Sequence, residues 1–204
     1  MFTVTYEIMF NTTPIFLLHG LGAHAVTLLP LELYLNYMGY KNTHKLSYPV
    51  DTMPFEECMD YVDKEMGKLA DKKEEIILIG QSMGGVVSNN LHKKGWRVKN
   101  AVYIGSPLHG ANLLNQLEAI LPTKIRDMFY KLPYDYLKAK EREDPPPHPY
   151  KTISMGWACS HFDGCVYQKE AMLEEENHVH LAWADHRTIF ANPRLWILVE
   201  RLIR

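Results

Sequence analysis

Short apolar runs alternate with longer helix-like segments along most of this chain. Runs of strand length occupy residues 15–18, 43–48, 76–79, 98–104, 152–155 and 179–183, and segments typical of helices occupy 28–38, 55–69, 83–94 and 195–203. Strands that alternate with helices form parallel βαβ units, and strands covered on both faces are short apolar runs. We therefore expect an α/β fold with a central, mostly parallel sheet and helices on both faces. The weak alternation of Val4, Tyr6 and Ile8 indicates an added edge strand.

Two of the expected helices carry specific signals. Apolar side chains recur with the spacing of one helix face at Phe55, Cys58, Met59, Val62, Met66 and Leu69. Before the last helix, Asn192 is a favoured N-cap residue, and Pro193 suits the first turn because its missing N–H has no intrahelical partner there. We expect an amphipathic helix in the first case and a closing helix in the second.

Residues 112–150 interrupt the alternation, because they are too many for a single crossover helix. Apolar stripes at 113–121 and 125–132 predict two helices, and the proline-rich run 144–149 ends them. The helices either pack as extra elements or form a lid over the active site, since the insert lies at the sheet edge where open α/β sheets bind ligands. We expect one domain over residues 1–204 with this insert at about 112–150.

Composition narrows the classes of function and location. The 204 residues suit one domain, and the net charge of −2, with no block of Lys or Arg, argues against a nucleic-acid partner. No apolar run approaches the about 20 residues of a membrane span, and the first residues lack the pattern of a signal peptide. The three cysteines, Cys58, Cys159 and Cys165, are too few for a disulfide framework, and free thiols are favoured over a Cys159–Cys165 pair. We expect a cytoplasmic location and leave the oligomeric state open.

The first candidate for chemistry is a serine between two glycines. Gly80, Ser82 and Gly84 fit the pattern G-x-S-x-G directly after the apolar run 76–79 and before a predicted helix. This context is typical of a nucleophile elbow, a sharp strand-to-helix turn that points the serine hydroxyl out over the sheet. The flanking positions must be small, because side chains there would clash with neighbouring backbone.

A serine hydroxyl needs a base, an acid that orients the base, and donors for the oxyanion. His186 follows the last predicted strand and is the candidate base, whereas His109 lies earlier in the chain and is a weaker one. Asp163 lies in a turn-rich loop after the strand near 152–155 and is the candidate acid. The weaker candidates for the acid are Asp135 and Asp144, which lie in the insert, and Asp185, which adjoins His186. The backbone N–H groups of the loop 19–22 and of Met83 are candidate oxyanion donors.

Several motifs together resemble those of the α/β-hydrolase superfamily, in its compact lipase/esterase type. The matching segments are His19–Gly22 (H-G-x-G), Gly80–Gly85 (G-[HQ]-S-M-G-G), Ile104–Gly110 (I-G-[ST]-P-x-x-G), Asp163–Val166 (D-G-x-V) and the loop Ala184–His186. The chain order serine, aspartate, histidine is also that of the superfamily. The resemblance covers nearly the whole chain except the insert. It implies an α/β-hydrolase fold and a Ser-His-Asp triad.

The resemblance also implies an activity and a set of site residues. It implies a serine hydrolase that cleaves small-molecule or lipid esters through an acyl-serine intermediate, without cofactor or metal, with transient contact to a lipid surface as a further expectation. The residues that carry over are Ser82, Asp163 and His186 as the triad, Leu21 and Met83 as oxyanion donors, and His19, Gly20, Gln81, Ser106 and Pro107 as residues that line the site.

Two alternatives stay open at this point. The same triad serves thioesterases, amidases and acyltransferases, and the fold also serves non-catalytic binding proteins. A metal site formed by His178, His180, His186 and Asp185 is disfavoured, because no spacing of Cys or Glu ligands supports it.

Overall fold

Six strands form one parallel sheet in the computed structural model, which describes residues 11–111, 144–157 and 160–204. The spatial order is β2-β1-β3-β4-β5-β6, and every neighbouring pair is parallel. The strands are β1 (Ile15–Leu18), β2 (Thr43–Leu46), β3 (Glu75–Gln81), β4 (Arg97–Ile104), β5 (Tyr150–Gly156) and β6 (His178–Ala182). The predicted parallel sheet is confirmed. The loops that contain the candidate site residues follow the carboxyl ends of β1, β3, β4, β5 and β6.

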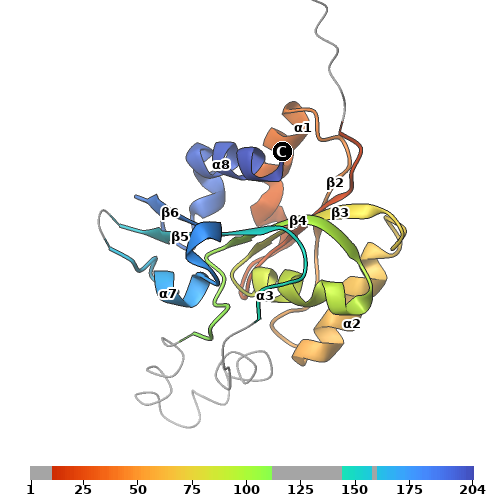
Figure 1. The fold of residues 1–204 in the computed structure, drawn as a ribbon, viewed down its shortest axis with the longest axis horizontal. Helices are drawn as coiled ribbons and strands as arrows, with labels where there is room; N and C mark the ends of the chain where they lie inside the picture. The colour runs from red at the N-terminus through yellow and green to blue at the C-terminus, as the bar shows by residue number, and fades with distance from the viewer. Residues whose placement is uncertain (1–10, 112–143, 158–159) are drawn as a thin grey trace, which may run out of the picture.

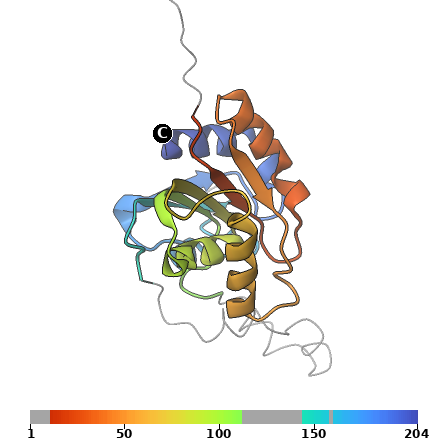
Figure 2. The same cartoon turned by 90° about the vertical axis from the view of Figure 1, so that its right-hand side faces the viewer.

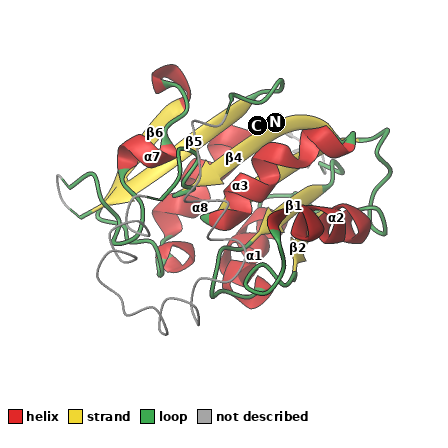
Figure 3. Ribbon diagram, turned by 90° about the horizontal axis from the view of Figure 1, so that it is seen from below, coloured by secondary structure: helices red, strands yellow, loops and turns green. Residues whose placement is uncertain are grey.

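Helices cover both faces of this sheet, as expected (Figures 1 and 2). On one face lie α1 (Leu29–Tyr37) and α8 (Pro193–Ile203), and on the other lie α2 (Phe55–Met66), α3 (Met83–Asn90) and α7 (Gln168–Ala171). Figure 3 views the molecule from the side of α2, α3 and α7. Within the described residues, short 3-10 turns occupy Ala25–Leu28, Leu91–Lys94, Glu175–Asn177 and Ile189–Ala191.

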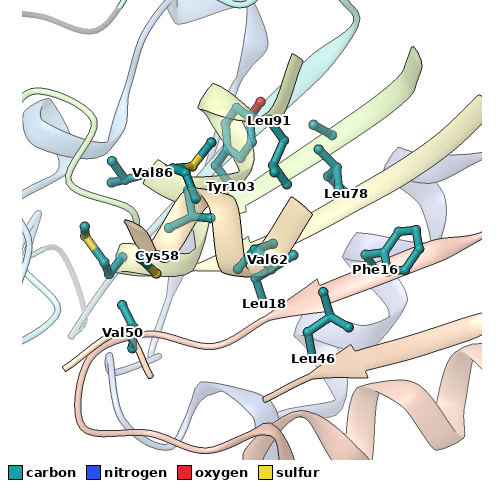
Figure 4. Packing of buried hydrophobic residues seen from close by; sticks show 14 of the residues in the cluster. Phe16, Leu18, Leu46, Val50, Cys58, Val62, Leu78, Val86, Leu91 and Tyr103 are labelled. Carbon is teal, nitrogen blue, oxygen red and sulfur yellow. The ribbon is translucent and has the colours of Figure 1, made fainter. Parts of the chain in front are cut away.

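The strands contribute side chains to two separate hydrophobic cores, because successive side chains point to opposite faces of the sheet. Phe16 and Leu18 of β1 pack with the residues of α2 and α3, and Figure 4 shows part of this cluster. Ile15 and Leu17 face the other core, together with the residues of α1 and α8. All four side chains are fully buried. This double burial explains why β1 is a short, continuously apolar run, whereas the edge strands β2 and β6 are partly exposed and contain polar residues.

The two helices with specific signals are confirmed, with one correction. The predicted stripe of α2 is buried as far as Met66. Leu69, however, is 46% exposed, because the helix ends at Met66 and the residue no longer lies on its apolar face. At the start of α8, the Asn192 side chain accepts a hydrogen bond from the N–H of Arg194 at 3.0 Å, and Pro193 occupies the first turn.

Other boundaries differ from the sequence prediction for local reasons. The segment predicted as one helix at 28–38 begins as a 3-10 turn, and α1 carries Pro30 in its first turn, where proline is tolerated. The segment predicted at 83–94 ends its α-helical part at Asn90 and continues as a 3-10 turn. The helix α7 was not predicted, since four residues are too few to show a helical period.

Some predictions lie outside the described residues. These are the edge strand near Val4 to Ile8, the two helices of the insert, Asp135 and Cys159. Cys58 and Cys165 are free thiols. Within the described parts of the chain, no helix combines the length and the apolar character needed to cross a bilayer.

Candidate active site

Ser82 lies at the sharp turn between β3 and α3. Its backbone has φ 55° and ψ −126°, in the region of positive φ that residues other than glycine rarely adopt. Such a conformation costs on the order of 1–3 kcal/mol and persists only where the surroundings enforce it. Here the N–H of Ser82 donates to the carbonyl of Ile104 at 2.9 Å, which ties the turn to the end of β4. The Ser82 side chain is half-buried at the carboxyl edge.

The glycines around Ser82 have no room for a side chain. A Cβ atom on Gly80 would lie 2.3 Å from the carbonyl oxygen of Gly84, and one on Gly84 would lie 2.3 Å from that of Leu18. A Cβ atom on Gly85 would lie 1.8 Å from Oγ of Ser106. The turn therefore depends on small residues, because α3 starts directly against the end of β1.

Asp163 and His186 form a buried pair in two loops after β5 and β6. Oδ2 of Asp163 lies 2.7 Å from Nδ1 of His186, and the N–H of His186 donates to the Asp163 carbonyl at 3.0 Å. The other carboxylate oxygen, Oδ1, accepts from the N–H groups of Cys165 at 2.9 Å and Val166 at 2.7 Å. The carboxylate is thus held at both oxygens, and the carboxylate–imidazole contact fixes a proton on Nδ1 of the ring.

The weaker acid and base candidates within the described residues, Asp144, Asp185 and His109, take no part in this pair. Asp185 accepts hydrogen bonds from the N–H groups of Arg187 and Thr188, both at 3.0 Å. Asp144 is exposed. His109 directs Nε2 to the carbonyl of Met172 at 2.7 Å. Among the described carboxylates, only Asp163 contacts the ring of His186.

Two contacts bring the Asp163–His186 pair to the Ser82 turn. Nε2 of Gln81, the residue before Ser82, donates to the carbonyl of His186 at 3.2 Å. At the end of β4, a Cβ atom on Gly105 would lie 3.0 Å from Oδ2 of Asp163 and 3.3 Å from Nδ1 of His186. The three residues predicted to act together therefore gather at the ends of β3, β5 and β6.

The loop after β1 packs directly against Ser82. A Cβ atom on Gly20 would lie 2.6 Å from Cβ of Ser82. The N–H of Ala23 donates to the carbonyl of Gly20 at 3.3 Å, and Gly22 has φ +66°, so residues 20–23 form a tight turn. The N–H of Leu21 donates to no acceptor among the described residues, and that of Met83 lies in the first turn of α3, where no intrahelical acceptor exists. Both predicted donors thus adjoin the serine turn.

Two residues of the β2–α2 connection hold this loop from behind, and neither was singled out by the sequence. The hydroxyl of Tyr48 donates to the carbonyl of His19, and the N–H of Gly22 donates to Oδ1 of Asp51 at 2.7 Å. The ring of His19 lies against that of Tyr48, tilted by 32°, and its Nδ1–H donates to the carbonyl of Gly20 at 2.9 Å. Burial raises the pKa of Tyr48 well above its ordinary value and lowers that of His19. Both groups are therefore neutral at pH 7.

A pocket of about 410 Å³ opens beside these residues. It is lined by Leu21, Gly22, Ala23, Thr27, Gln81, His186, Arg187 and Phe190. Three of the predicted site residues, Leu21, Gln81 and His186, thus face one cavity. Ser106 and Pro107 are buried, and Oγ of Ser106 lies 3.4 Å from the carbonyl of Ile104, so Ser106 packs behind the serine turn.

The residues of the disfavoured metal site separate into two groups. His178 and His180 share one face of β6, where both bond to Oγ of Ser154, at 2.9 and 2.8 Å, and His186 bonds to Asp163 instead. Nδ1 of His178 also bonds to Oγ1 of Thr152 at 2.7 Å. Burial, and secondarily the neighbouring His180, lower the pKa of His178 to about 4. No group of three or more metal-ligating side chains occurs within the described parts of the chain.

Known structures match the fold of this chain, although no protein-family model and no curated protein matches the sequence. The mature lipase BlEst2 of Bacillus licheniformis is similar with a TM-score of 0.69 and 16% identity, over 94% of this chain and 92% of the lipase. Phospholipase PlaB of Legionella pneumophila is similar with a TM-score of 0.73 and 14% identity, over 95% of this chain and 60% of PlaB. A monoacylglycerol lipase of Paleococcus ferrophilus is similar with a TM-score of 0.61 and 19% identity, over 94% of this chain and 96% of the lipase.

At these low sequence identities, the structural similarity is evidence for the fold. The parallel sheet with helices on both faces and the serine turn between β3 and α3 agree with it. The chain therefore has the fold of the α/β-hydrolase superfamily, as its motifs predict.

Proposed function

We propose that this protein hydrolyses carboxylic esters, with Ser82 as nucleophile, His186 as general base and Asp163 as the residue that orients His186. The observation that carries the proposal is the buried 2.7 Å contact between Asp163 and Nδ1 of His186, placed beside a serine held at positive φ. This contact leaves Nε2 as the basic nitrogen of the ring. A serine with such a base is the standard arrangement of acyl transfer.

The reaction proceeds in two half-reactions. Oγ of Ser82 attacks the ester carbonyl while Nε2 of His186 takes the hydroxyl proton, and a tetrahedral intermediate forms. That intermediate collapses, the bond to the alcohol oxygen breaks, and His186 returns the proton to the leaving alcohol. Water, deprotonated by His186, then attacks the acyl-serine and releases the carboxylic acid and free Ser82.

The oxyanion is stabilised by the backbone N–H groups of Leu21 and Met83. The contact between Gly20 and Ser82 supports this assignment, because it holds the Leu21 loop against the nucleophile. The N–H of Met83 belongs to the first turn of α3, where the helix dipole also favours negative charge. A single donor of this kind is worth about 2.7–4 kcal/mol in the transition state.

Oxyesters are favoured over thioesters, amides and acyl transfer. The similar structures named above are a lipase, a phospholipase and a monoacylglycerol lipase, all named for oxyester cleavage. The pocket beside His186 also has polar and apolar residues, including Thr27, Arg187 and Phe190, which suit an ester substrate with a polar group.

The proposal is tested with three substrates that share one acyl group and differ in the leaving group: an oxyester, a thioester and an amide. We expect turnover of the oxyester, and a loss of about 10⁴- to 10⁶-fold in kcat for Ser82→Ala. The Tm of that variant, measured alongside, should be no lower, because Ala keeps Cβ, the atom of Ser82 that packs against the Gly20 loop, and removes only Oγ. Unchanged turnover in Ser82→Ala would contradict the role of Ser82. Turnover of the thioester or amide alone would replace the oxyester assignment, and no turnover of any substrate would favour a binding protein.

A further inference from the structure

We propose that Tyr48 and Asp51 are positioning residues of the oxyanion loop, the segment 19–22, and that they hold it in the orientation needed for catalysis. The inference rests on the ester hydrolysis proposed above. It concerns two residues that lie outside the sequence motifs of the site. Both residues lie in the connection between β2 and α2, and neither touches the reacting atoms. Three consecutive peptide units of the loop carry the argument.

The first peptide unit joins His19 to Gly20. Its carbonyl accepts the hydrogen bond from the Tyr48 hydroxyl. The Tyr48 side chain is 5% exposed, and its ring centroid lies 4.5 Å from that of His19. Because burial raises the pKa of Tyr48, its hydroxyl keeps its proton and remains a donor across the working pH range. Tyr48 therefore fixes both the backbone and the ring of His19.

The second peptide unit joins Gly20 to Leu21, and its N–H is the proposed oxyanion donor. Its carbonyl accepts from Nδ1–H of His19 at 2.9 Å and from the N–H of Ala23 at 3.3 Å. The N–H and C=O of a trans peptide point in opposite directions, so anchoring the carbonyl aims the N–H of Leu21 the other way. The His19 ring that anchors this carbonyl is itself packed against Tyr48.

The third peptide unit joins Leu21 to Gly22. Its N–H donates to Oδ1 of Asp51 at 2.7 Å, and Gly22 has φ +66°. This is the peptide that rotates when a turn changes between types I and II. A change of that kind would shift Leu21 and the N–H it presents. The Asp51 carboxylate opposes the rotation, because it would lose a charge-assisted hydrogen bond.

The parallel sheet explains why these contacts form. Leu18 of β1 is paired with Leu46 of β2, so the two strands end side by side at the carboxyl edge. His19 follows β1 by one residue and Tyr48 follows β2 by two. The β2–α2 connection is thus placed against the outer side of the oxyanion loop, away from Ser82.

The test compares Asp51→Ala, Asp51→Asn and Tyr48→Phe with Thr52→Ala, an exposed position in the same connection. For each variant, kcat and KM on the oxyester are measured together with the inhibition constant of an alkyl trifluoromethyl ketone. That ketone forms a tetrahedral adduct on a serine nucleophile and places its oxyanion in the same hole. A residue that acts only on folding would lower Tm without changing the ketone's affinity relative to that of the substrate.

We expect Asp51→Ala to lower kcat about 10- to 100-fold, part of the 10²- to 10³-fold loss that follows removal of a whole donor, with KM within about twofold. The ketone should weaken in parallel with kcat/KM. Asp51→Asn, which keeps an acceptor oxygen, should recover most of the activity, Tyr48→Phe should act in the same direction as Asp51→Ala, and Thr52→Ala should match the wild type.

Undiminished kcat and ketone affinity in both Asp51→Ala and Tyr48→Phe would overturn the inference while leaving the proposed function in place. Equal losses in Asp51→Asn and Asp51→Ala would also overturn it, since the retained acceptor would then have no effect. A wild-type protein that turns over no ester and binds no ketone would contradict the proposed function itself, and the inference with it.

Discussion

Two histidine sites lie close together in this chain, and their partners differ in charge. His186, in the loop after β6, has the Asp163 carboxylate on Nδ1. His178, at the start of β6, has hydroxyl groups on both ring nitrogens, from Thr152 and Ser154. Both rings are held by hydrogen bonds. Only the first has a partner that stabilises a positive charge on the ring.

The difference shows what a general base needs beyond a fixed position. A carboxylate on Nδ1 stabilises the imidazolium that forms when Nε2 takes a proton. Hydroxyl partners supply no such charge, and they occupy both nitrogens of His178, so that ring has no nitrogen left for a substrate. Burial then keeps His178 neutral, with a pKa of about 4. We therefore expect substitution of His186 to lower kcat and substitution of His178 to lower Tm.

The largest effect should come from the histidines themselves. We expect His186→Asn to lower kcat about 10⁴- to 10⁶-fold, because the proposed general base is lost. His178→Asn should leave kcat within a few-fold and lower Tm instead, since it loses two partly buried hydrogen bonds, each worth about 1 kcal/mol. Ester kinetics and thermal melts on the two variants measure both effects. The assignment fails if His178→Asn proves the more damaging to kcat.

The next effect concerns the acid. We expect Asp163→Asn to lower kcat about 10⁴-fold, because an amide favours the wrong tautomer of His186 while still accepting from the N–H groups of Cys165 and Val166. Asp185→Asn, next to the histidine in sequence but bonded elsewhere, is the matched control and should change kcat little. Steady-state kinetics on both variants decide between the two carboxylates. A larger loss in Asp185→Asn would transfer the role to that residue.

The smallest effect concerns how the stability of the fold changes with pH. Because the folded pKa of His178 is about 4, below the ordinary value of 6.5, the unfolded chain binds a proton there first as the pH falls. Protonation therefore favours unfolding, and this contribution to stability is lost between pH 6.5 and about 4. The ring is partly exposed, so we discount the effect to about 1 kcal/mol, or about 2–4 °C in Tm. His178→Gln should reduce the fall in Tm between pH 7 and 4.5, and identical falls in the two proteins would contradict the account.

The parts of the fold and site with local signals could be predicted from the sequence. The central strands are recognisable as apolar runs. Gly80, Ser82 and Gly84 predict a sharp turn, and the structure shows that neighbouring backbone leaves no room for a side chain on either glycine. The Asp163–His186 contact was predicted from two loops far apart in sequence, because their order matched that of a known superfamily.

The sequence analysis missed other features, for two different reasons. Tyr48 and Asp51 bond to residues 29 positions away, and these contacts become visible only once β1 and β2 are paired. These contacts depend on tertiary placement, which periodicity does not encode. Leu69 is a different case: it fits the helical period of α2, but the helix ends at Met66 with Gly67 as its C-cap, a local stop signal that outweighs the apolar period.

The central claim is that Ser82 carries the acyl group during turnover. It is tested most directly by quenching the reaction with a slowly hydrolysed oxyester in acid and locating the acyl group by peptide mass spectrometry. The account predicts one acyl group on the peptide that contains Ser82, with none in Ser82→Ala and its accumulation slowed in His186→Asn. Rapid turnover with no acylated peptide, or an acyl group on another residue, would contradict it.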